Sequence, residues 1–362
     1  MSLKSKANIV RRKIMHSLTQ NIGKKSISEM QQKATQFNVK RVLISRPNHR
    51  LGNMLLITPL VQEICNTFPN CSIDLFVKGK ITPIIFENYP QVNQIIELPK
   101  KPLKDFKAYL KTWVSLKQTK YDLVINVEKG SSSGRISTII PTANFKFYGD
   151  DFEDLKSKFS DFEHIAKYPV YNFRKFLELL NQTPQKNEVP VLDIKLSTNE
   201  LQSGKTKLDN VTNNQTKKTI AFFTYATGAK CYSVDWWQAF YDEFYPKYAQ
   251  NYNLIEILPV ENISQLQRKL PTFYSKDIRE IASVMANCEL VVAADSGMMH
   301  LSSAALTPTL GLFSVTRTEV YAPYGNNSTF VNTNFENYTN IIQKVDAILQ
   351  AKSKYTKATK TL

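Results

Sequence analysis

The sequence predicts an α/β protein with parallel sheets in two domains. The chain has 362 residues, more than one hydrophobic core usually supports. Short runs rich in Val, Ile and Leu alternate with helical patterns, which is typical of βαβ units. The clearest unit covers residues 287–316, where a Val-rich strand, a polar turn, a helix of small residues and a second strand follow one another.

The first predicted domain covers residues 40–182. A helix is expected over 53–67, with Pro59 distorting its first turns because proline lacks a backbone N–H. A second helix is expected over 104–117, with an apolar face that includes Phe106 and Leu110 packed inward and lysines outward. The expected strands cover residues 41–45, 72–77, 94–98, 122–127 and 144–148.

The second predicted domain covers residues 183–335, beginning in a polar connection that contains two prolines. Residues 336–362 form a last helix and a tail, and this helix is expected to pack back on the first domain. Residues 1–39 form a basic N-terminal extension. The expected strands of the second domain cover residues 219–224, 253–258, 288–293 and 309–313.

Positive charge is concentrated in two stretches of a chain whose net charge is +16. Residues 1–40 hold nine Lys or Arg against one Glu, and residues 100–120 hold seven Lys against one Asp. No nucleic-acid-binding motif accompanies these runs, so a nucleic-acid partner is not expected. An anionic membrane surface or an acidic lipid-linked acceptor fits this charge, and a solvated tail remains the alternative for the N-terminus.

The sequence shows neither a signal peptide nor an apolar run long enough for a membrane span. We therefore expect a cytoplasmic protein, with peripheral contact at the cytoplasmic face of the inner membrane left open. We also expect no cofactor and no bound metal, and the lack of a clear D-x-D motif agrees with the absence of a metal.

The turn after the Val-rich strand combines groups that suit an anion with a carboxylate. Ser296 and Gly297 present backbone N–H groups at a helix start, where the helix dipole favours an anion. Asp295 suits sugar hydroxyls, and His300 lies one helical turn further on. The alternative is that Asp295 or Ser296 is only a helix cap and that His300 is a surface residue.

A second polar turn follows the strand at 219–224. Its glycine, Gly228, lets the backbone approach a phosphate, and Lys230 adds a positive charge. Thr227 precedes this glycine. The alternative is that Lys230 is an ordinary exposed lysine.

Several of these motifs resemble glycosyltransferase family 9, the ADP-heptose:lipopolysaccharide heptosyltransferases. The segment DSGMMHLSSAALTPTLGLF, which begins at Asp295, is similar to the family's D-[ST]-G-x-x-H-x-x-A-A turn and helix, and residues 41–60 are similar to its opening strand and helix. The resemblance implies a GT-B fold, with two Rossmann-like domains whose parallel sheets face a central cleft. It also implies an inverting, metal-independent transfer of heptose from ADP-heptose to lipopolysaccharide core, with a nucleotide-sugar donor and an acidic lipid-linked glycan acceptor as partners.

This sequence departs from the family at the presumed catalytic base. Asn53 stands where the family has an aspartate, and an asparagine side chain cannot accept the proton. We therefore name Glu128 as the first candidate base and His49, whose unperturbed pKa is near 6.5, as the second. The full set of predicted site residues is: catalytic, Glu128, His49 and Asn53; donor-binding, Lys230, Thr227, Gly228, Asp295, Ser296, Gly297 and His300; acceptor-binding, Arg50, Lys104, Lys107 and Lys111.

Two other functions remain open. The loss of the aspartate at Asn53 fits a nucleotide-sugar-binding protein that no longer catalyses transfer. A sugar-nucleotide epimerase or dehydrogenase would have similar layers, but the G-x-G-x-x-G fingerprint is absent.

Overall fold

The computed structural model describes residues 17, 31, 34, 37–100, 104–128, 130–212 and 215–351. Most of the predicted basic extension and the tail after residue 351 lie outside these residues. The chain forms two compact units, which divide mainly between Pro190 and Val191. Two short segments of the first half, Arg50–Thr58 and Ile84–Asn88, belong to the second unit.

The first unit contains a five-stranded parallel sheet in the order β3-β2-β1-β4-β5. The central strands are buried on both faces, as the continuous apolar runs predict. The order reverses between β1 and β4, which makes the edge after these two strands a topological switch point. The strands are β1 (Arg41–Arg46), β2 (Ser72–Lys78), β3 (Val92–Leu98), β4 (Lys120–Asn126) and β5 (Thr142–Phe147).

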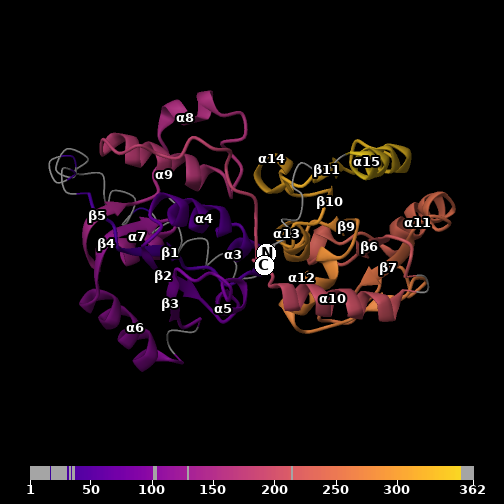
Figure 1. The fold of residues 1–362 in the computed structure, drawn as a ribbon, viewed down its shortest axis with the longest axis horizontal. Coiled ribbons are helices and arrows are strands. Elements are labelled where there is room, and N and C mark those ends of the chain that lie inside the picture. The colour runs from indigo at the N-terminus through magenta and orange to yellow at the C-terminus, as the bar shows by residue number, and fades with distance from the viewer. Residues whose placement is uncertain are drawn as a thin grey trace. The chain divides into compact units, whose positions relative to one another are not determined.

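Helices cover both faces of this sheet, with α6 on one face and α4 and α9 on the other (Figure 1). Trp113 and Leu116 of α6 pack toward the sheet, where Trp113 lies against Phe76. The predicted inward face of α6 is wrong for Phe106 and Leu110, which are 61% and 52% exposed, because only part of the helix's apolar arc faces the sheet. The helices are α4 (Thr58–Thr67), α5 (Thr82–Ile85), α6 (Phe106–Gln118), α7 (Ser132–Ile139), α8 (Glu153–Lys158) and α9 (Tyr168–Leu179).

The helix predicted over 53–67 is two helices, α3 (Leu51–Leu55) and α4. Pro59 is the second residue of α4, where the missing N–H costs no internal hydrogen bond. The chain therefore breaks before the proline, and α3 can leave the first unit and join the second.

The second unit contains a six-stranded parallel sheet in the order β11-β10-β9-β6-β7-β8. Counted from its own first strand, β6, this sheet has the same order as the first unit with one strand added, so its switch point lies between β6 and β9. The two predicted parallel α/β sheets are thus confirmed. The strands are β6 (Thr219–Phe223), β7 (Asn253–Ile257), β8 (Thr272–Phe273), β9 (Leu290–Ala294), β10 (Thr309–Phe313) and β11 (Thr329–Asn332).

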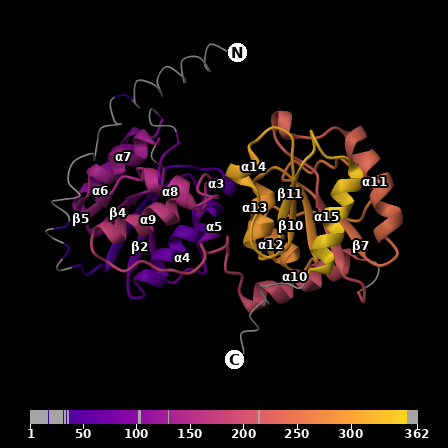
Figure 2. The same ribbon diagram turned by 90° about the horizontal axis from the view of Figure 1, so that it is seen from above.

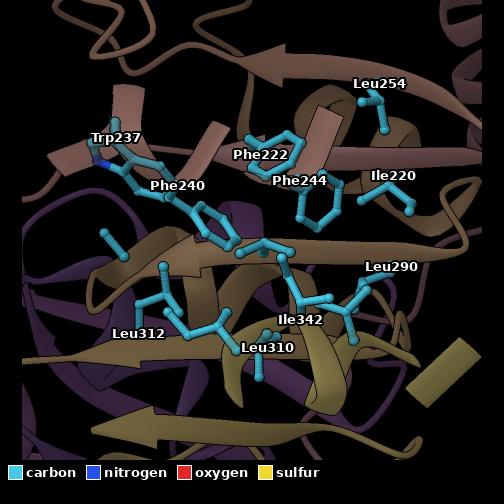
Figure 3. Packing of buried hydrophobic residues seen from close by; sticks show 14 of the residues in the cluster. Ile220, Phe222, Trp237, Phe240, Phe244, Leu254, Leu290, Leu310, Leu312 and Ile342 are labelled. Carbon is cyan, nitrogen blue, oxygen red and sulfur yellow. The ribbon is translucent and has the colours of Figure 1, made fainter. Parts of the chain in front are cut away.

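The core of the second unit is rich in aromatic side chains from α11, which pack on apolar residues of the strands (Figure 3). The last helix, α15, lies beside α11 (Figure 2), and its residues Ile341, Ile342 and Val345 are part of this same core. The apolar face of α15 is therefore used within the second unit, and its packing on the first domain stays a prediction. The helices are α10 (Thr198–Val211), η2 (Gly228–Lys230), α11 (Val234–Tyr248), α12 (Ile278–Ala286), α13 (Gly297–Ala304), α14 (Thr318–Tyr321) and α15 (Tyr338–Gln350).

Among the described residues, no helix is both long and apolar enough to cross a bilayer.

Candidate functional site

The candidate donor site lies at the switch point of the second sheet. β6 and β9 are hydrogen-bonded neighbours, with Phe223 opposite Ala293. The loop after β6 and the turn after β9 therefore leave the sheet side by side. These are the two turns in which the sequence placed the donor-binding residues, and open α/β sheets bind ligands at such edges.

Asp295 follows β9 and is only 4% exposed. Its Oδ2 atom lies 3.2 Å from Nζ of Lys230 and accepts a hydrogen bond from the hydroxyl of Thr316. Its backbone N–H donates to the carbonyl of Leu312 at 3.0 Å, which fixes its position on the sheet edge. Asp295 is therefore not the helix cap. It is a buried carboxylate held by one cation and one hydroxyl.

Ser296 occupies the N-cap position of α13, but its side chain makes no capping hydrogen bond. Its Oγ atom is buried and has no hydrogen-bond partner within the described part of the chain. Such atoms are rare in proteins. The first N–H groups of α13 also have no partner within their own helix. The start of α13 thus offers hydrogen-bond donors suited to an anion.

Two glycines let α3 pack closely on α13. A Cβ on Gly52 would lie 2.9 Å from Cδ2 of His300, and a Cβ on Gly297 would lie 3.2 Å from the backbone N of Gly52. His300 is 5% exposed, so it is a buried residue of this contact and not a surface residue. The contact brings α3, with Asn53 half-buried on it, into the same unit as Asp295. Arg50, the N-cap residue of α3, is exposed.

The loop after β6 carries the remaining predicted donor-binding residues. Thr227 is the N-cap residue of η2, and Gly228 has a φ of +65°. A Cβ on Gly228 would meet no atom within 4 Å. The glycine is therefore favoured by the left-handed backbone and not by lack of space. Lys230 ends η2, pairs with Asp295 and has a side chain that is 29% exposed, so it is not an ordinary exposed lysine.

Sequence reasoning missed two polar residues at this edge. Thr316 lies in the loop after β10 and donates to Asp295. Glu256 is fully buried near the end of β7 and accepts a 2.6 Å hydrogen bond from the hydroxyl of Thr224. Burial raises the pKa of Glu256, although hydrogen bonds from Ser264 and Thr224 act in the opposite direction. Its only sequence signal was an acidic residue inside an apolar strand.

The predicted bases lie at the switch point of the first sheet. Ser45 of β1 pairs with Asn126 of β4, so the residues after these strands meet at one edge. Glu128 forms an ion pair with Arg46, whose side chain is 4% exposed while that of Glu128 is 44% exposed. His49 is exposed, and its backbone N–H donates to the side chain of Asn48 at 2.8 Å.

Asn126 has a structural role at this edge. Its Nδ2 group donates to the carbonyls of Glu128 and Tyr148, each at 2.8 Å, and so joins the turns that follow β4 and β5. A carboxylate could not donate these hydrogen bonds. These two hydrogen bonds explain why an amide suits position 126.

The predicted acceptor-binding lysines of the first unit, Lys104, Lys107 and Lys111, are all exposed and lie in or just before the first turns of α6. A crossover helix runs back across its sheet, so the start of α6 lies toward the carboxyl edge, the edge that carries Glu128. No cluster of three or more His, Cys, Asp or Glu side chains that could hold a metal occurs in the described ranges.

Part of this chain matches the model of a known protein family. The model of "Glycosyltransferase family 9 (heptosyltransferase)" matches residues 261–348, which include the turn at Asp295. Lipooligosaccharide heptosyltransferase 2 of Haemophilus influenzae is 23% identical over 316 residues, which are 80% of this chain and 88% of that protein.

Solved structures share the fold. The glycosyl transferase family 9 protein of Veillonella parvula aligns with a TM-score of 0.68 and 16% identity, over 87% of this chain and 98% of that one. The Escherichia coli heptosyltransferase WaaC, solved with ADP, aligns with a TM-score of 0.62 and 16% identity, over 85% of this chain and 99% of that one. The predicted resemblance to family 9 and the GT-B type of two parallel-sheet domains are confirmed.

Proposed function

We propose that this protein, a heptosyltransferase-like glycosyltransferase of the family 9 type, transfers heptose from ADP-heptose to a lipopolysaccharide-core or related cell-surface glycan. In this reaction the bond between the sugar's anomeric carbon and the diphosphate oxygen breaks, and its electron pair passes to the diphosphate. The acceptor hydroxyl oxygen bonds to the same carbon, and its proton passes to a base. The second unit binds the donor, and the first supplies the acceptor-side chemistry.

The main observation in support of donor binding is that hydrogen-bond donors at the start of α13 lack partners among the described residues. A diphosphate would accept hydrogen bonds from the buried Ser296 hydroxyl and from the backbone N–H groups of Ser296 and Gly297. His300, which is buried in the same helix, contacts the pyrophosphate. The bound ADP of the similar WaaC structure supports a nucleoside diphosphate as the ligand.

Lys230 and Asp295 have complementary roles. Lys230 neutralises the charge that develops on the leaving diphosphate, which is the usual way a fixed cation speeds phosphate departure. Asp295 accepts hydrogen bonds from sugar hydroxyls and, through the 3.2 Å ion pair, keeps Lys230 at the sheet edge until the donor binds. Thr227 and Gly228 shape the loop that presents Lys230.

On the acceptor side, Glu128 accepts the proton. Its half-exposed carboxylate is held by the buried Arg46, so its position is fixed while one face stays open to solvent. His49 is the second candidate. Asn53 and Arg50 bind acceptor or donor hydroxyls without proton transfer, and Lys104, Lys107 and Lys111 attract the acidic acceptor. The reaction takes place at the cytoplasmic face of the inner membrane, where the lipid-linked acceptor lies.

The second candidate function, nucleotide-sugar binding without transfer, is favoured by Asn53 alone. The two functions separate in a transfer assay with ADP-heptose and purified lipopolysaccharide-core acceptors. We expect product from the unaltered protein. Donor binding without product, together with product from an Asn53→Asp variant, would establish the binding function instead.

Donor identity is tested by thermal shift with ADP, GDP, UDP and CMP, since a ligand that binds only the folded state raises Tm. We expect ADP to give the largest shift and Lys230→Gln to reduce it. Lys247→Gln is the matched control, because Lys247 also pairs with an aspartate, Asp346, on the surface of the same unit. Equal loss in both variants, or no shift with any nucleotide, would refute the proposed donor site.

A further inference from the structure

We propose that α6 docks the first unit on an anionic lipid bilayer, with Phe106, Leu110 and Val114 as the inserted side chains. These residues are 61%, 52% and 47% exposed. They are spaced four apart, so each lies about 40° around the helix from the one before. They therefore form a single apolar stripe on the outer side of α6, and a contiguous exposed apolar stripe commonly marks an interaction surface.

The orientation of this stripe is fixed by the neighbouring face of the helix, which packs on the sheet. Leu116 is fully buried, and Trp113 packs on Phe76 at a ring distance of 5.2 Å. The hydroxyl of Thr112 donates to the carbonyl of Glu97 on β3 at 3.3 Å. The helix therefore cannot turn its outer stripe inward without losing this packing. The stripe is a permanent outer surface of the first unit.

The charges beside the stripe favour lipid over a protein partner. Residues 104–118 contain four lysines and a single acidic residue, Asp105. Lys104, Lys107, Lys111 and Lys117 are all exposed, and none forms an ion pair with another described residue. Helices that lie in a membrane interface combine such an apolar stripe with flanking lysines, whose chains extend toward the lipid phosphates. Juxtaposed lysines add attraction to anionic lipid.

This docking extends the proposed function without depending on it. A lipid-linked acceptor lies in the membrane plane, and the start of α6 is on the same side of the first sheet as Glu128. Membrane contact through α6 would therefore bring the candidate base toward the acceptor. Vesicle binding itself needs neither donor nor acceptor, so it can be measured even if the transfer activity is assigned wrongly.

The test is co-sedimentation of the full chain with phosphatidylcholine vesicles that contain or lack 30% phosphatidylglycerol, at about 0.1 M salt. We expect binding to the anionic vesicles only. A Phe106→Ser/Leu110→Ser variant should weaken it about tenfold, because two apolar anchors are removed. The matched control is Phe335→Ser/Val260→Ser, which removes exposed apolar residues of the second unit, 85% and 63% exposed, and should bind as the unaltered protein does.

Two further readouts keep the interpretation specific. Circular dichroism should show that the α6 variant is folded, and transfer to a water-soluble, deacylated acceptor should be unchanged. Undiminished vesicle binding by the α6 variant would overturn the proposal and point to another surface, such as the basic N-terminal stretch. Loss of a dimer in light scattering, without loss of vesicle binding, would instead identify the stripe as a contact between copies of the chain.

Discussion

The two units share a strand order, yet the carboxyl edges of their sheets carry different chemistry. In the second unit, the edge has backbone donors at the start of α13 and a single Lys–Asp pair, Lys230 with Asp295. In the first unit, two buried arginines, Arg46 and Arg135, are paired with carboxylates that are 44% and 45% exposed. One edge presents hydrogen-bond donors, and the other presents carboxylates.

This difference teaches that topology decides where a ligand binds and side chains decide which ligand binds. A diphosphate is recognised by N–H groups and hydroxyls, which the second edge leaves unsatisfied. A proton acceptor must be a carboxylate or an imidazole that solvent or an acceptor sugar can reach, and the first edge provides Glu128. If this is right, substitutions in the second unit should affect the donor, and substitutions in the first unit should affect proton transfer.

The largest effect is expected for Asp295→Asn. The substitution keeps the shape of the side chain but removes the charge that holds Lys230 and orients it toward the diphosphate. We expect kcat/KM for transfer to fall about 10²- to 10³-fold. Asp346→Asn, which removes the partner of Lys247 on the surface of the same unit, should leave kcat/KM within about twofold. Similar losses in the two variants would show that Asp295 only stabilises the fold.

A smaller but selective loss is expected for Glu128→Gln. If Glu128 takes the acceptor's proton, kcat should fall about 10²-fold while the donor KM stays nearly constant. Asp150→Asn is the matched control, because it removes the partner of Arg135, the other buried arginine of this edge. Both variants should lower Tm, since each removes the charge of a carboxylate that pairs with a buried arginine. Only Glu128→Gln should lower kcat, and an unchanged kcat would transfer the role of base to His49.

A moderate effect on stability is expected where the first half of the chain joins the second unit. Gly52→Ala would place a Cβ 2.9 Å from the buried His300 ring, so α3 must move away from α13. We expect the free energy of unfolding to fall by about 1–3 kcal/mol in urea titrations. At Gly130 a Cβ meets no atom within 4 Å, and Gly130→Ala should change stability by about 0.5 kcal/mol or less. Equal effects would contradict a close α3–α13 contact.

The smallest effect concerns pH. Burial raises the pKa of Glu256, so the folded protein retains this proton more strongly than the unfolded chain. The stability that results is complete below the unfolded pKa and is lost as pH rises through the folded pKa. Glu256→Gln cannot ionise, so its Tm relative to the unaltered protein should rise between pH 5 and pH 8, by about 2–4 °C. A difference in Tm that is constant across this pH range would contradict a raised pKa of Glu256.

Glu200, in the same unit, has a lowered pKa where Glu256 has a raised one. Burial disfavours its ionised form, but hydrogen bonds from Arg279 and Ser197 outweigh burial and lower the pKa of Glu200 to about 2. Its contribution to stability is present above the unfolded pKa and is lost as pH falls toward 2. Glu200→Gln should therefore have a lower Tm than the unaltered protein at pH 7. The two Tm values should become similar only in acid.

The strands and the donor turn could be predicted because local sequence determines them. Continuous apolar runs can be buried only inside a sheet covered on both faces, and Asp295-Ser296-Gly297 interrupts such a run at its carboxyl end. The break before α4 was signalled by Pro59, although the pattern did not show that the separated piece, α3, would join the other unit. A periodic pattern shows which face of a helix is apolar but not what covers it. For the same reason, the exposure of Phe106 was predicted wrongly.

The pairings at the site depend on sheet register, which sequence periodicity does not give. Lys230 reaches Asp295 because β6 and β9 are neighbours, and Thr316 reaches it because β10 lies beside β9. Both contacts join loops that are far apart in the chain. Glu256 was missed because a buried acid inside an apolar strand has no periodic pattern that separates it from a surface residue.

The central claim is that main-chain donors at the start of α13 hold the donor's diphosphate. Hydrogen–deuterium exchange with and without ADP tests it most directly, because these N–H groups have no partner within their helix and become hydrogen-bonded only when an anion binds. We predict slower exchange in peptides covering residues 294–300 and 224–231, and no change in peptides covering residues 120–128 of the first unit. Protection that is absent from 294–300, or that appears instead at the first sheet's edge, would contradict the account.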